Sequence, residues 1–97
     1  MKIVIQKSSR AAKKWQASSD GNRTVHFGAS GYEDFTTSGD ETRRKSYIQR
    51  HSNEDWSKSN MMSPAFMSRW VLWEKKSIAA AIRNLNEKYT DVSFQLA

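Results

Sequence analysis

The stretch KKWQASSDGNRTVHF, from Lys13 to Phe27, decides the fold of this chain. Two segments of alternating apolar and polar residues flank Ser19-Asp20-Gly21-Asn22, whose residue types are typical of a β-hairpin turn. A two-residue loop at Asp20-Gly21 would mix apolar and polar side chains on both faces of the hairpin. A three-residue loop, Asp20-Gly21-Asn22, separates them, because side chains alternate between the faces of a strand. We therefore predict the three-residue loop, with Asn22 in the left-handed region of backbone space.

This register gives the predicted hairpin one apolar and one polar face. Trp15 pairs with Phe27 on the apolar face, and Ala17 pairs with Val25. The polar face carries Lys14, Gln16, Ser18, Thr24 and His26. A sheet buries its apolar face against another element, so we expect helices from later in the chain to cover this one.

Short signals elsewhere predict one more strand before the hairpin and three helices after it. The β-branched run Ile3–Ile5 predicts the strand. Ser38-Gly39-Asp40-Glu41 has the spacing of a capping box and predicts the first helix. Ser63-Pro64 places proline at the first position of a second helix, and Ser77 precedes apolar residues at helical spacing. The alternating residues 92–96 are an added strand at most.

The tryptophans of the second half fall into two groups. Phe66, Trp70 and Trp73 recur at helical spacing and are interpreted as core. Trp56 lies in a polar loop, where it is either a lid on the core or an exposed stacking platform; we favour the lid. Three cations lie off the apolar stripe and are expected to face outward, as possible interaction residues: Arg69, Lys75 and Lys76.

The predicted fold is therefore α+β: a small antiparallel N-terminal sheet, made of the hairpin and the short strand, packed by about three helices. The length of 97 residues predicts a single domain over 1–97 with one modest core. The chain has no cysteine, which excludes disulfides, thiolate zinc sites and cysteine nucleophiles. No apolar run approaches the length that spans a bilayer, so we expect no membrane partner.

Glycines and histidines invite catalytic or cofactor interpretations, which the surrounding residues disfavour. Gly28 and Gly31 lack the lysine of a phosphate-binding loop, and the acids after Gly31 would repel phosphate, so we interpret them as a strand end and a turn. Two histidines, His26 and His51, make at most half a zinc site, and a structural or capping role is preferred for both. We predict no catalytic residue, no metal and no cofactor. Tyr32 and Phe35 are expected to tuck the connection that follows onto the core.

The net charge of +6 favours an acidic partner such as nucleic acid, although basic charge also serves solubility alone. Phosphate contacts from Lys and Arg supply most sequence-independent affinity for nucleic acid. No motif for reading bases is present. The predicted nucleic-acid-binding residues lie on the hairpin and on the first helix: Lys13, Lys14, Arg23, Arg43, Arg44, Lys45 and Arg50.

Several motifs, in order, give the chain a family resemblance. These are VHFG at Val25–Gly28, GYEDFT at Gly31–Thr36, YIQRH at Tyr47–His51 and SRWVLW at Ser68–Trp73. With them the chain resembles a family of small uncharacterised viral proteins of large eukaryotic DNA viruses and phages. The resemblance covers residues 13–89, departs at Pro64, and leaves 90–97 as a C-terminal extension. It implies a viral origin and a shared fold, and no activity.

These observations predict a small basic viral or phage accessory protein, without catalysis, that binds nucleic acid or a nucleoprotein complex through a basic surface. The alternative is a protein–protein interaction module, such as a minor virion component or an inhibitor of a host or viral protein. A hydrolase or nuclease comes third and needs a pocket that joins His26 or His51 to carboxylates. We expect the protein inside the host cell, in the cytoplasm or at the site of viral replication, with the virion as the alternative.

Overall fold

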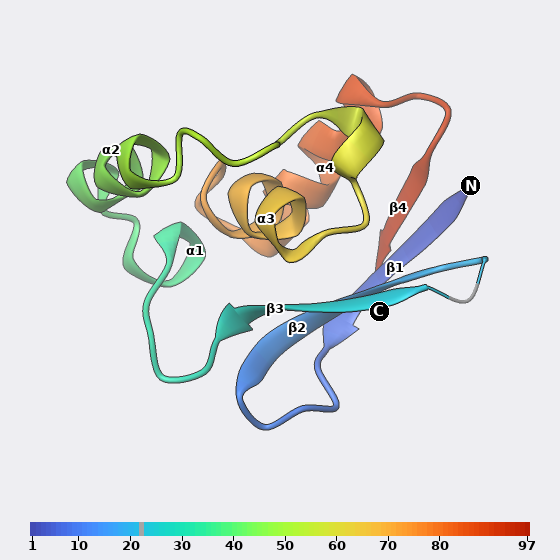
Figure 1. Ribbon diagram of the computed structural model, residues 1–97, viewed down its shortest axis with the longest axis horizontal. Coiled ribbons are helices and arrows are strands. Elements are labelled where there is room, and N and C mark those ends of the chain that lie inside the picture. The colour runs from blue at the N-terminus through green and yellow to red at the C-terminus, as the bar shows by residue number, and fades with distance from the viewer. Residues whose placement is uncertain (22) are drawn as a thin grey trace.

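The computed structural model describes residues 1–21 and 23–97. Over these residues the fold is α+β, as predicted, with a four-stranded sheet on which the helices pack (Figure 1). The strands are β1 (Lys2–Lys7), β2 (Lys13–Ser19), β3 (Thr24–Ala29) and β4 (Ser93–Leu96). The helices are α1 (Phe35–Ser38), α2 (Glu41–Arg50), the 3-10 helix η1 (Lys58–Asn60), α3 (Pro64–Met67), the π-helix η2 (Ser68–Leu72) and α4 (Ile78–Lys88).

The hairpin has the predicted register. Trp15 pairs with Phe27 and Ala17 with Val25, and the backbone N–H of Ser19 donates to the carbonyl of Arg23 across the three-residue loop. The conformation predicted for Asn22 lies outside the described residues.

The sheet order is β3-β2-β1-β4, and β4 pairs with β1 in parallel. The sheet is therefore mixed, not purely antiparallel as predicted. The alternating segment at the C-terminus does form the added strand, because its Phe94 fills the apolar face next to Ile3.

The core lies between the apolar face of the sheet and the helices, which gather on one side of it (Figure 1). Ile3, Ile5, Ala17, Phe27 and Phe94 are the buried sheet residues. The helical layer contributes Phe66, Met67, Val71, Leu72, Ile82 and Leu85. Helices α1 and α2 lie beyond the C-terminal end of β3, whereas the hairpin turn lies at the opposite end of the sheet (Figure 1).

The connection from β3 to α2 differs from the prediction. The predicted capping box at Ser38 is wrong: Asp40 is the N-cap of α2, and its carboxylate accepts from the backbone N–H groups of Thr42 and Arg43. A short helix, α1, precedes it and has its own capping box, formed by Asp34 and Thr37. A short polar side chain one residue before a helix satisfies the first free N–H groups, and here Asp40 is closer to the helix than Ser38.

The other two helix starts are confirmed. Ser63 caps α3 by accepting from the backbone N–H of Phe66, with Pro64 at the first helical position. Ser77 caps α4 by accepting from Ala80.

Two side chains, those of Tyr32 and Arg69, differ from the prediction in whether they are exposed or buried. Phe35 is buried as expected, but Tyr32, which follows Gly31 in the left-handed region (φ 84°), is 74% exposed. Arg69 is buried, at 8% exposed, rather than facing outward.

No helix within residues 1–21 and 23–97 is long and apolar enough to cross a membrane. In the same part of the chain, no cluster of three or more His, Asp or Glu residues has the geometry to hold a metal ion.

Candidate nucleic-acid interface at the α2 groove

A groove runs between α2 and the open end of the hairpin, where β2 begins and β3 ends. Its deeper part is a cavity of about 340 Å³ beside the ends of β2 and β3. A second hollow of about 320 Å³ lies over the outer face of α2. Tyr32, Glu33 and Trp73 line both, so the two hollows adjoin each other. We call them together the α2 groove, defined by Lys13, Tyr32, Arg43, Arg50, His51 and Trp73.

A stack of three rings gives the groove a rigid wall. Tyr47 lies between His51, with ring centroids 4.2 Å apart, and Trp73, at 4.5 Å and an interplanar angle of 5°. Burial, reinforced by the nearby charge of Glu54, raises the pKa of Tyr47 to about 12, so its hydroxyl stays neutral at physiological pH.

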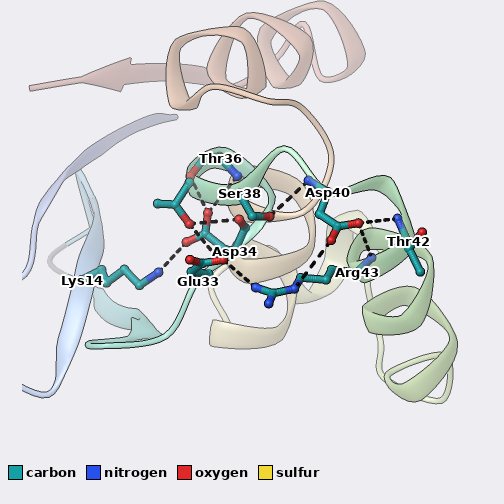
Figure 2. Close-up of polar contacts among 9 residues, drawn as sticks. Lys14, Glu33, Asp34, Thr36, Ser38, Asp40, Thr42 and Arg43 are labelled. Atoms are coloured by element: carbon teal, nitrogen blue, oxygen red, sulfur yellow. Dashed lines mark hydrogen bonds and ion pairs between the residues drawn. The ribbon is translucent and has the colours of Figure 1, made fainter.

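Polar contacts tie the loop that carries Tyr32 to the hairpin and to α2 (Figure 2). The carboxylate of Asp34 caps α1 and accepts from Lys14 Nζ at 2.6 Å. Glu33 pairs with Arg43 of α2, and Arg43 also lies 3.7 Å from Asp40. The loop is therefore anchored to the hairpin through one acid and to α2 through the other.

A second ion-pair cluster joins α2 to the segment after η2. Glu74 accepts from Arg44 at 2.6 Å and from Arg69 at 2.9 Å. Burial alone would raise the pKa of Glu74, but the hydrogen bonds from these two arginines outweigh it and hold that pKa below its usual range. Burial would likewise lower the pKa of Arg44, yet the hydrogen bonds to Glu74 and Glu41 raise it. This cluster fixes α2 against the helical layer, so it supports the groove without lining it.

Comparison with known proteins places the chain in a family. Residues 3–51 match the family of unknown function DUF5754. The chain belongs to this family. The matched segment runs from β1 to the end of α2, so this DUF5754 protein takes most of its α2 groove from it, whereas Trp73 comes from outside it. No curated protein and no solved structure matches the chain.

The seven cations predicted from sequence do not form one surface. Lys13, Arg43 and Arg50 line the α2 groove. Lys45 is exposed on α2, the helix that also carries Arg43 and Arg50. Arg23 lies beside the hairpin turn, at the other end of the sheet, where its Nη2 donates to the carbonyl of Met62. A strand of seven residues separates the two ends by roughly 20 Å.

Two of the predicted cations are occupied by internal partners. Lys14 lines the cavity, but its Nζ pairs with Asp34 and its side chain is 20% exposed. Arg44 donates through Nε to the carbonyl of Trp73 as well as pairing with Glu74. Both therefore hold the groove together rather than offering a free charge at its surface.

The predicted interaction residues of the second half also separate. Arg69 lies against the rings of Trp56 (5.3 Å) and Trp70 (4.4 Å), so it is part of the packing. Trp56 is half-buried and donates its indole N–H to Glu54, as a covered ring rather than an exposed platform. Lys75 and Lys76 are exposed and lie outside the α2 groove.

The two histidines have separate surroundings. His26 Nδ1 lies 2.7 Å from the hydroxyl of Ser8 on the hairpin. His51 Nδ1 lies 2.9 Å from Glu54 Oε2, and both residues line the deeper part of the groove. His51 therefore shares a hollow with carboxylates, whereas His26 lines neither hollow of the groove.

Sequence reasoning missed Tyr32 and Trp73 as groove residues. Tyr32 lies in a loop with no periodic pattern, and Trp73 ends an apolar stripe that reads as core. The glycine directly before Tyr32 was the available signal, because a left-handed residue reverses the direction of the chain.

Proposed function

We propose that this DUF5754 protein is a small basic accessory protein of a virus or phage that binds nucleic acid, or a nucleoprotein complex, through the rim of the α2 groove without cleaving it. The observation that carries the proposal is a set of exposed cations with free charge. Among the described residues, Lys13, Lys45 and Arg50 form no ion pair. The viral origin rests on the motif resemblance from Val25 to Trp73.

The footprint supported by the geometry is smaller than the one read from the sequence. It consists of Lys13, Arg43 and Arg50, which line the groove, together with Lys45, which is exposed on α2 outside the lining, and it leaves out Lys14, Arg23 and Arg44. Arg43 is 56% exposed, so it can reach a phosphate even though Glu33 neutralises part of its charge. On duplex DNA, three free cations predict a salt dependence of modest size: a slope of about −2.7 in log K against log salt, or a loss of about fortyfold between 50 and 200 mM.

Charge reversal at the three free cations tests the proposal. The variant K13E/K45E/R50E should lose most of its affinity for DNA and RNA, and the remaining affinity should depend less on salt. The matched control is K2E/R23E/R83E, which makes the same change in net charge at exposed cations that neither line the groove nor lie on α2. Equal losses in both variants, or no binding by the wild-type protein, would refute the proposal. Reversal of Arg44 is avoided, because it would expose Glu74 to a like charge.

Hydrolysis is the second candidate, because His51 and Glu54 line the same cavity as Glu33 and Asp34. A carboxylate that accepts from Nδ1 leaves Nε2 of the imidazole as the proton acceptor of a general base. Each carboxylate here already has a partner, however, which favours the binding role. Incubation of labelled DNA and RNA with wild-type and H51Q protein decides between them: cleavage that disappears in H51Q supports the enzyme.

The protein–protein alternative predicts a contiguous exposed apolar patch. The large hydrophobic side chains exposed in the described chain are Met1, directly before β1, Tyr32, in the connection after β3, and Leu96, at the end of β4. Purification from infected cells with and without nuclease separates the two classes of partner: loss of the co-purified material after nuclease supports nucleic acid, and one protein retained in stoichiometric amount supports the alternative.

A further inference from the structure

Tyr32 is the largest exposed ring in the described chain and lies within the α2 groove. It is 74% exposed, although aromatic rings usually bury most of their surface. Its loop is fixed by the ion pairs of Glu33 and Asp34 on its C-terminal side, so the ring is presented by a defined backbone. An exposed ring on an anchored loop is a preformed surface for a flat partner.

Cations surround this ring on the α2 side. Arg43 and Arg50 line the same hollow as Tyr32, two helical turns apart, or about 10 Å along the helix. Ser46 adds a hydroxyl group between them, and Thr42 adds another directly before Arg43. The hollow therefore combines an aromatic face with positive charge and hydrogen-bonding groups within the length of one or two nucleotides.

From this combination we infer that the ligand of the groove is single-stranded nucleic acid, with a base stacked on Tyr32 and the backbone held by Arg43 and Arg50. The inference rests on the proposed function and names its substrate class. In a duplex the faces of the bases are already stacked on one another, so an external ring has no base face to contact. Single strands offer free faces, and stacking tolerates any sequence because every base has a π-face.

The acids of the hollow do not oppose this arrangement. Glu33 lines it but is paired with Arg43, and Asp34 is buried beneath the loop with Lys14 as its partner. Arg50 donates through Nε to the carbonyl of Ser46, which leaves the outer nitrogens of its guanidinium for phosphate. The free charge next to Tyr32 is thus that of Arg50, because Glu33 and Asp40 partly neutralise Arg43.

Fluorescence anisotropy with oligothymidylate, oligouridylate and a DNA duplex tests the inference, with variants Y32A, Y32F and R50Q. We expect tighter binding to the single strands than to the duplex. Y32A should weaken single-strand binding about five- to a hundredfold, Y32F should keep it, and neither should change the salt slope. R50Q should reduce that slope by about 0.7. The DNA and RNA arms show whether the sugar matters.

Failure of the inference and failure of the proposed function give different results. Salt-dependent binding that favours the duplex and ignores Y32A overturns the inference and leaves the proposed function standing. Absence of binding to all three probes overturns both. Since Tyr32 is exposed, its variants should fold normally, and their circular dichroism spectra and melting temperatures verify this.

Discussion

Gly28 provides the sharpest test of how the hairpin meets the helical layer. Its φ is 78°, and a Cβ placed on it would lie 2.9 Å from Leu72 Cδ1. Leu72 is 1% exposed in η2, so its side chain has little room to move away. Gly28→Ala therefore combines two costs: a left-handed conformation, about 1–2 kcal/mol, and overpacking, about 1–2 kcal/mol because the opposing atom is terminal.

The sum predicts that Gly28→Ala lowers the free energy of unfolding by about 2–4 kcal/mol. For a domain of this size that corresponds to a fall in melting temperature of about 10–25 °C, measured by circular dichroism. Gly31→Ala is the matched control: its φ is 84°, but no atom lies within 4 Å of the added Cβ. It should show the backbone cost alone, about 1–2 kcal/mol.

A double mutant isolates the contact. Leu72→Val removes the atom that a new Cβ would meet, so in that background the cost of Gly28→Ala should fall to that of Gly31→Ala. Equal costs for the two glycines in the wild-type background would refute the close approach. No destabilisation by Gly28→Ala would refute the positive φ as well.

Three further perturbations follow from the ion pairs and the ring stack. Glu74→Gln leaves two arginines without their carboxylate and should lower the free energy of unfolding by about 2–4 kcal/mol at pH 7, measured by urea unfolding. Because the folded pKa of Glu74 is lowered, this difference from the wild type should shrink as the pH falls below about 4. A difference that stays constant with pH would contradict the ion-pair assignment. The pKa of Tyr47 is raised to about 12, so its contribution is complete below pH 10 and is lost as the pH rises through 12; Tyr47→Phe should remove that alkaline dependence, and an unchanged profile would disprove the burial. Asp34→Asn should lower the melting temperature clearly, because it removes the charged partner of Lys14. Asp40→Asn, at the exposed cap of α2, should change the melting temperature little, since asparagine caps a helix equally well. Similar effects of the two variants would argue against the buried pair of Asp34 and Lys14.

The hairpin register was predictable because its determinants are local. Side-chain alternation and the residue types of the loop lie within Lys13–Phe27, and the choice between two loop lengths follows from them. The starts at Ser63 and Ser77 are local signals in the same sense. The first helix was harder, since Ser38 and Asp40 both suit a cap and the choice depends on the intervening α1.

The α2 groove was not predictable from the sequence, because contacts between distant segments form it. Arg69 belongs to the core because Glu74 and the tryptophan rings meet it there, and helical periodicity alone places it outside. Arg44 turns inward for the same reason. Tyr32 is exposed although it is a large aromatic side chain, and composition does not reveal this. The charge count favours an acidic partner, but it does not indicate which cations remain free.

The most direct test of the central claim is an NMR titration of the ¹⁵N-labelled protein with a short single-stranded oligonucleotide. The account predicts that the largest changes in amide chemical shift fall in residues 29–34 and 43–51, around Tyr32 and α2, and diminish as salt is added. Changes centred on the hairpin turn around Arg23, or no changes at low salt, would contradict it.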